Sequence, residues 1–163
     1  MAHDTITTLA TLVGARLRIL GLTLATAESC TGGWVSQAVT SISGSSEWFE
    51  RGFVTYSNAA KEEMLGVAST TLERHGAVSE QCAAEMAGGT LLRSRADIAL
   101  SVTGVAGPTG GTAEKPVGMV CFAWMGKGRA GVCATRRFSG DRESVRRQSV
   151  IAALQGTLEF LEG

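Results

Sequence analysis

The stretch Thr26-Ala27-Glu28-Ser29-Cys30-Thr31-Gly32-Gly33 lies between an apolar run, residues 22–25, and a segment, residues 34–39, that can continue as a helix. This order predicts a strand that ends in a turn and leads directly into a helix. At such a turn, free backbone N–H groups and the helix dipole favour negative charge. Ser29 and Cys30 are therefore candidate nucleophiles beside groups that can stabilise an oxyanion, which is half of an acyl-transfer site.

Strand-like and helix-like segments extend outward from this turn. Apolar residues recur at helical spacing from Ile6 to Leu20, with Asp4 and Thr5 as possible caps and Gly21 as a left-handed stop. Strand-like runs are found at residues 22–27, 52–57, 98–103, 117–125 and 132–138.

Three further helices complete the expected framework. Asn58 and Ser79 can cap the first two, and Gly140-Asp141 precedes the third, which runs to about Leu161. Early alternation of strands and helices, with two adjacent strands late in the chain, predicts a three-layer α/β/α sandwich around a mixed β-sheet. At 163 residues without a Pro-rich or Ser-rich linker, we expect one domain covering 1–163.

Composition excludes several classes of function. The chain has 15 basic and 15 acidic residues, a formal net charge of zero, and no dense basic block, so we expect no nucleic-acid partner. Its four cysteines form no CxxC pair, which argues against a metal site and favours reduced thiols in a cytoplasm. No apolar run approaches the roughly 20 residues that span a bilayer, so we expect a soluble, cytoplasmic protein without a membrane partner.

Tyr56 and Lys61 supply the base that the first turn lacks. A strand ends near Tyr56, and Lys61 lies in the first turn of the next helix, so both are expected at the strand ends where α/β sheets bind ligands. At a reference pKa of about 10.4, only about one lysine in 2,500 is neutral at pH 7. Lys61 can therefore act as a base only if it is desolvated or lies beside positive charge, such as that of Arg142.

A glycine-rich loop follows the third strand. The segment 101–112 has neither a Walker ending nor the spacing of a dinucleotide fingerprint, but its glycines allow close backbone approach to a ligand. Thr103 and Gly104, at the strand end, are candidate ligand contacts, and Arg142 is a candidate contact for a phosphate. The segment that contains Ser46 is typical of a turn that leads into the core.

Six blocks in the same order over almost the whole chain resemble the CinA C-terminal domain family. They are Ala27-Glu28-Ser29-Cys30-Thr31-Gly32-Gly33, Tyr56-Ser57-Asn58-Ala59-Ala60-Lys61, His75-Gly76-Ala77-Val78-Ser79-Glu80, Thr103-Gly104-Val105-Ala106-Gly107-Pro108, Glu114-Lys115-Pro116-Val117-Gly118 and Phe138-Ser139-Gly140-Asp141-Arg142.

The resemblance implies an enzyme that hydrolyses the carboxamide of nicotinamide mononucleotide to nicotinic acid mononucleotide and ammonia, in pyridine-nucleotide recycling. It implies no metal and no cofactor, a small-molecule partner, and a homodimer or higher homo-oligomer. The family's serine and lysine fall on Ser29 and Lys61, with Tyr56 as a further catalytic residue. Substrate-binding candidates are Thr31, Gly32, Gly33, Ser46, Asn58, Thr103, Gly104 and Arg142.

Three alternatives stay open at this point. A non-catalytic nucleotide- or phosphate-binding module could use the same glycine turns and Arg142, with Ser29 serving only as a helix cap. A thiol amidase could use Cys30, although neither His3 nor His75 lies in a motif that resembles its partner base. An interaction partner related to a larger competence protein would turn over no pyridine nucleotide.

Overall fold

The computed structural model describes residues 4–163. Its core is a five-stranded sheet in the order β2-β1-β3-β4-β5. The elements follow the chain as α1 (Thr5–Leu20), β1 (Leu24–Glu28), α2 (Trp34–Thr40), the 3-10 helix η1 (Ser45–Glu47), β2 (Phe49–Val54), α3 (Asn58–Leu65), α4 (Ser69–His75), α5 (Glu80–Leu92), β3 (Ile98–Gly104), β4 (Met119–Gly126), β5 (Arg129–Arg137) and α6 (Arg142–Glu162).

The sheet is mixed, as the sequence predicts. β1 pairs in parallel with both β2 and β3, whereas β4 is antiparallel to β3 and β5 is antiparallel to β4. The carboxyl ends of β1, β2 and β3 therefore meet at one edge of the sheet.

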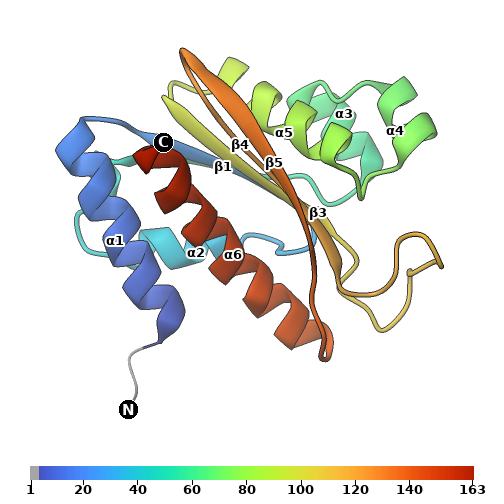
Figure 1. The fold of residues 1–163 in the computed structure, drawn as a ribbon. Helices are drawn as coiled ribbons and strands as arrows, with labels where there is room; N and C mark the ends of the chain where they lie inside the picture. The colour runs from blue at the N-terminus through green and yellow to red at the C-terminus, as the bar shows by residue number, and fades with distance from the viewer. Residues whose placement is uncertain (1–3) are drawn as a thin grey trace.

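Helices cover both faces of the sheet. α1, α2 and α6 lie on one face, and α3, α4 and α5 lie on the other (Figure 1). On the first face Leu17 and Leu154 join one large buried cluster, and on the second Ala83 packs beside Ala99. The three-layer α/β/α sandwich is therefore confirmed.

Most of the predicted helix ends are those of the structure. Asp4 caps α1, whose end is followed by Gly21 at φ 68°, and Ser79 and Asp141 cap α5 and α6. The predicted cap at Asn58 is wrong by one residue. Ser57 has the extended backbone that a cap requires, and its hydroxyl accepts from Ala60 N.

Strand positions differ from the predicted ones mainly at the sheet edges. β2 begins at Phe49 and ends at Val54, so Tyr56 lies beyond the strand, and β5 begins at Arg129 rather than at Val132. The short helix α4 was not predicted. Both edge strands are largely exposed, so they lack the alternation of buried and exposed positions on which a strand prediction depends.

Helix α5 packs very closely against the end of α3. A Cβ atom at Gly89 would collide with the main-chain carbonyl oxygen of Leu65, the last residue of α3. Only glycine permits this approach, which fixes the helix that carries Lys61.

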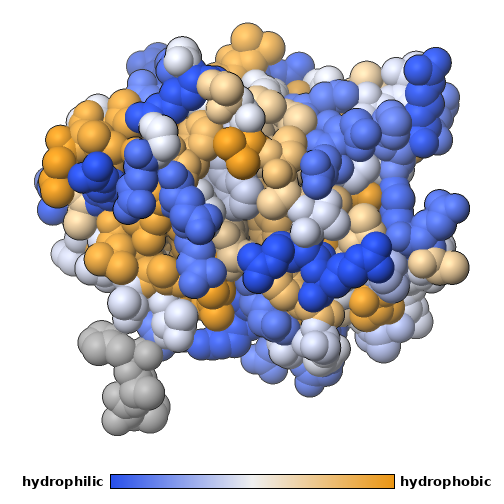
Figure 2. Space-filling view, viewed as in Figure 1, coloured by the Kyte–Doolittle hydropathy of each residue, from blue (hydrophilic) through white to orange (hydrophobic). Residues whose placement is uncertain are grey.

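The surface carries an apolar area over the C-terminal half of α1. Figure 2 shows hydrophobic residues gathered there, and Ile19 and Leu20 at the end of the helix are exposed. Within residues 4–163, no helix is both long enough and apolar enough to cross a membrane. The expected homo-oligomer stays a prediction.

Candidate active site

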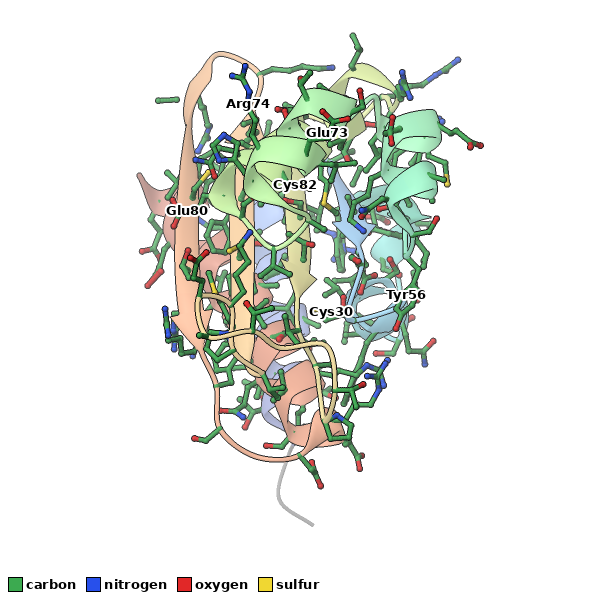
Figure 3. The ribbon with its side chains drawn as sticks, turned by 90° about the vertical axis from the view of Figure 1, so that its right-hand side faces the viewer. Cys30, Tyr56, Glu73, Arg74, Glu80 and Cys82 are labelled. Atoms are coloured by element: carbon green, nitrogen blue, oxygen red, sulfur yellow. The ribbon has the colours of Figure 1, made fainter. Side chains whose placement is uncertain are left out.

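The candidate site is a cavity at the carboxyl ends of the three parallel strands. Ser29 directly follows β1, Tyr56 follows β2 by two residues, and Thr103 lies at the end of β3. Figure 3 shows Cys30 and Tyr56 at this end of the sheet. The cavity has a volume of about 370 Å³ and is lined by Ser29, Cys30, Tyr56, Asn58, Lys61, Ala77, Val78, Thr103, Gly104, Val105, Ala106, Gly107, Thr109, Gly110 and Arg142.

Lys61 contacts Ser29 directly inside the protein. Its Nζ lies 3.0 Å from Ser29 Oγ, 3.0 Å from the carbonyl oxygen of Thr55 and 3.3 Å from that of Tyr56. The lysine is only 1% exposed and Ser29 only 7%. A nucleophile and a basic nitrogen are therefore within hydrogen-bond reach, as proton transfer between them requires.

Burial is what lowers the pKa of Lys61. Desolvation is the largest influence on its pKa, and the nearby Cys82 and Cys30 thiols act weakly in the opposite direction. Of the two conditions that the sequence leaves open, the structure provides desolvation.

The two carbonyl oxygens are placed to orient Lys61 in its neutral form. A neutral lysine has two N–H bonds and one lone pair. If the N–H bonds point to the carbonyl oxygens of Thr55 and Tyr56, the lone pair is left facing Ser29 Oγ. In this form the amine can accept the serine proton without moving.

Tyr56 contributes its backbone and its phenol to different places. Its carbonyl oxygen lies beside Lys61 and Ser29, whereas the phenol is at the rim of the cavity, where its oxygen accepts from Arg142 Nη2 at 3.2 Å. Arg142 also donates to the carbonyl oxygen of Gly107 at 2.7 Å. Tyr56 is 61% exposed. The phenol is thus placed to hold Arg142, while Lys61 reaches Ser29 without it.

Cys30 is a poor nucleophile in this setting. Burial raises the pKa of the Cys30 thiol to about 12 against the lowering effect of a backbone hydrogen bond. Glu28 adds to the rise, and the positive charges of Arg146 and Lys61 oppose it. Because the thiolate is the reactive form, this raised pKa disfavours Cys30 as a nucleophile at neutral pH.

Thr31, Gly32 and Gly33 shape the turn but do not line the cavity. Thr31 is fully buried and its hydroxyl donates to Glu28 Oε1 at 2.7 Å. The N–H of Gly32 donates to the carbonyl oxygen of Ser29, and both glycines have positive φ. They are not among the residues that line the cavity, and their role in binding substrate stays a prediction.

The other predicted binding residues divide clearly. Asn58, Thr103, Gly104 and Arg142 line the cavity. Ser46 lies in η1, which leads into the start of β2, and the carbonyl oxygen of the nearby Trp48 accepts from Leu24 N at the start of β1. Because parallel strands begin at the edge opposite to the site, Ser46 is remote from the cavity.

Two charged residues at the site were missed by sequence reasoning. Glu28 is fully buried beneath the turn, and the half-buried Arg146 donates to the carbonyl oxygens of Cys30 and Thr31. A carboxylate at the end of a mostly apolar strand is one signal for Glu28. For Arg146 the signal is its spacing of four residues from Arg142, which puts both on one face of α6.

Residues 4–163 contain no group of three or more His, Cys, Asp or Glu side chains placed to hold a metal ion. His3 lies outside the described residues. His75 lies at the end of α4, lines a separate surface cavity and is not among the residues around Ser29.

Residues 6–161 match the family described as the CinA C-terminal domain. Nicotinamide-nucleotide amidohydrolase of Enterobacter agglomerans is 56% identical over 151 residues, covering 92% of both chains. The protein of the same name from Escherichia coli K12 is 57% identical over 143 residues, covering 88% of this chain and 87% of the relative.

Solved structures show the same fold. Competence/damage inducible protein CihA from Agrobacterium tumefaciens gives a TM-score of 0.95 at 44% identity, covering 100% of this chain and 99% of that one. A CinA superfamily protein from Klebsiella pneumoniae gives a TM-score of 0.93 at 40% identity, covering 98% and 99%.

Proposed function

Because the chain belongs to the CinA C-terminal domain family, we propose that it hydrolyses the carboxamide of nicotinamide mononucleotide to nicotinic acid mononucleotide and ammonia. Relatives that are 51–57% identical over most of the chain carry the name of this activity. The observation that carries the proposal is the buried contact of 3.0 Å between Lys61 Nζ and Ser29 Oγ.

The first half of the reaction forms an acyl-enzyme. Ser29 Oγ attacks the carboxamide carbon while neutral Lys61 takes the serine proton. As the tetrahedral intermediate collapses, Lys61 returns that proton to the amide nitrogen, the C–N bond breaks and ammonia leaves. Lys61 acts directly, because its nitrogen already contacts the serine oxygen and no relay through the Tyr56 phenol is required.

The second half reverses the roles of the same groups. Water attacks the ester carbon, and its proton passes to Lys61. The C–O bond to Ser29 breaks, the serine regains that proton from Lys61, and the product acid leaves as a carboxylate after releasing its remaining proton to solvent. The cycle consumes one water and needs no redox or metal chemistry.

The cavity suits a nucleotide in size and charge. Its volume of about 370 Å³ lies within the range of small-molecule sites, about 300–1,000 Å³. The guanidinium of Arg142 at the rim offers the donors and the positive charge that a phosphate needs. Asn58, Thr103 and Gly104 supply the remaining polar wall in this proposal. The reaction assigns the protein to pyridine-nucleotide recycling.

The test measures product. The purified protein is incubated with nicotinamide mononucleotide, and ammonia and nicotinic acid mononucleotide are quantified for the unmodified chain, Ser29→Ala, Lys61→Ala and the surface control Lys127→Ala. We expect turnover that Lys127→Ala retains and that both site variants lose by at least about 10³-fold.

Other outcomes separate the alternatives. If the unmodified chain binds the nucleotide but releases no ammonia, the result would favour a non-catalytic binding module over an enzyme. Turnover that survives in Ser29→Ala but not in Cys30→Ala would show that the nucleophile is the Cys30 thiol. Lack of both binding and turnover would favour the interaction partner.

A further inference from the structure

The turn that carries Ser29 is held by two charged side chains that take no part in the proposed chemistry. Glu28 comes from the end of β1, and Arg146 comes from the second turn of α6. Both side chains bind the same short segment, residues 29–36. Glu28 accepts hydrogen bonds from it, and Arg146 donates hydrogen bonds to it.

Glu28 replaces the missing cap of α2. The cap residue of this helix is Gly33, which has no side chain to accept from the first N–H groups. Glu28 Oε1 accepts from Val35 N at 2.7 Å, and Oε2 accepts from Ser36 N at 2.9 Å. The hydroxyls of Thr31 and Ser36 donate to the same carboxylate at 2.7 and 2.8 Å. A fully buried carboxylate with four donors ties the strand end, the turn and the helix together.

Arg146 binds the opposite kind of group. Its Nε and Nη2 donate to the carbonyl oxygens of Cys30 and Thr31, each at 3.1 Å. Its guanidinium carbon lies 5.5 Å from the centre of the Trp34 ring, a cation–π distance. These carbonyls belong to the two residues after Ser29, so the guanidinium fixes the chain on the C-terminal side of the nucleophile.

We propose that Glu28 and Arg146 are positioning residues, here called the turn clamp, that keep Ser29 Oγ within hydrogen-bond reach of Lys61. Lys61 is fixed independently by α3 and by the carbonyl oxygens of Thr55 and Tyr56. The distance between the two reacting groups therefore depends on the turn. The kinetic consequence of the clamp rests on the proposed function.

The neighbouring arginine provides a matched control. Arg147 is exposed and pairs with Asp4 at the start of α1, away from the turn. We expect Arg146→Ala to lower kcat by about 10²-fold, the size of effect of displacing a reacting group by about 1 Å. KM and the acid limb of the pH profile should stay the same, because substrate contacts and Lys61 are unchanged. Arg147→Ala should retain kcat.

Two additional readouts separate positioning from general loss of structure. Guanidinium ion at a non-denaturing concentration should restore part of the kcat of Arg146→Ala and none of that of Lys61→Ala. Glu28→Gln keeps the shape of the side chain but turns an acceptor into a donor facing α2, and we expect it to lower kcat at unchanged KM. Thermal unfolding verifies that each variant is folded.

A fluorophosphonate probe tests the clamp without the nucleotide. Ser29 Oγ forms a bond to phosphorus, fluoride leaves and Lys61 takes the serine proton, so the labelling rate reports the alignment of these two groups. We expect slower labelling in Arg146→Ala and Glu28→Gln but not in Arg147→Ala.

The outcomes distinguish the two proposals. If the unmodified chain is labelled but releases no ammonia, the proposed function fails and the labelling rates decide the clamp. A folded Arg146→Ala variant with normal kcat or normal labelling, or one whose loss lies in KM or is not restored by guanidinium, would overturn the clamp. A chain that neither turns over nor is labelled would overturn both proposals, because there would be no reactive serine to position.

Discussion

Lys61 Nζ lies 3.0 Å from Ser29 Oγ although the two residues are 32 positions apart in the chain. The contact follows from the sheet, because Ser29 directly follows β1 and Lys61 lies in the first turn of α3, just after the parallel strand β2. Long side chains on a helix point back toward its N-terminus, so the lysine reaches toward the strand ends. The proposed chemistry is thus built from two neighbouring strand-to-helix connections.

The pH dependence of the reaction should reveal the buried lysine. Only neutral Lys61 can accept the serine proton, so kcat/KM should rise with pH and level off above the pKa of Lys61 in the free enzyme. Because burial lowers that pKa, the midpoint should lie below about 10.4, the value for an exposed lysine. A pH profile of nicotinamide mononucleotide hydrolysis measures it. An acid limb with its midpoint at or above the exposed value would contradict a desolvated lysine base.

Removing the phenol of Tyr56 should affect binding rather than the base. The phenol contacts Arg142, whereas the backbone carbonyl contacts Lys61. We expect Tyr56→Phe to raise KM, because Arg142 loses a partner, and to leave the acid limb of kcat/KM where it is. Steady-state kinetics across pH decide the matter. A displaced acid limb would show that the phenol belongs to the proton path after all.

The thiol next to the nucleophile should react slowly. Burial raises the pKa of Cys30 to about 12, and Cys30 is only 5% exposed. Iodoacetamide at pH 8 should therefore modify the partly exposed Cys133 before Cys30, with activity retained while only Cys133 is labelled. Peptide mass spectrometry measures which cysteine is modified first, and residual activity is measured at the same time points. Early modification of Cys30 together with inactivation would show a reactive thiol at the site.

Local sequence patterns were sufficient for most of the framework. Residues close together in the sequence determine the apolar stripe of α1, between Asp4 and Gly21, and the cap at Ser79. The structure has both features where they were predicted. The rule that ligand sites form at the carboxyl ends of parallel strands likewise placed Ser29 and Lys61 at the same edge of the sheet. Each of these features depends on neighbours in the chain or on a general rule of sheet topology.

Features that depend on contacts between distant segments could not be predicted. Arg146 donates to the carbonyl oxygen of Cys30, a contact that joins residues more than a hundred positions apart in the chain. Ser46 shares a polar sequence context with residues that line the cavity, but it lies at the opposite edge of the sheet. The spacing of Arg146 from Arg142 shows that they share a face of α6, but it does not show which segment that face contacts.

Two adjacent glycines in α5 should respond in opposite ways to alanine. A Cβ at Gly88 would meet nothing closer than Met125 Sδ at 3.9 Å, which is ordinary contact, so Gly88→Ala should stabilise the protein by about 0.5–1 kcal/mol through its helix preference. A Cβ at Gly89 would instead collide with the main-chain oxygen of Leu65. We expect Gly89→Ala to destabilise the protein by about 1–3 kcal/mol, since backbone cannot rotate away as a side chain can.

Because Leu65 ends the helix that carries Lys61, only Gly89→Ala should also lower kcat. Urea unfolding of both variants, with turnover measured in parallel, compares the two positions within one helix. Equal stability changes at Gly88 and Gly89 would show that the contact between α5 and α3 yields easily. Loss of stability at Gly89 with unchanged kcat would show that α3 keeps Lys61 in place without α5, which would leave the carbonyl oxygens of Thr55 and Tyr56 as the groups that fix the lysine.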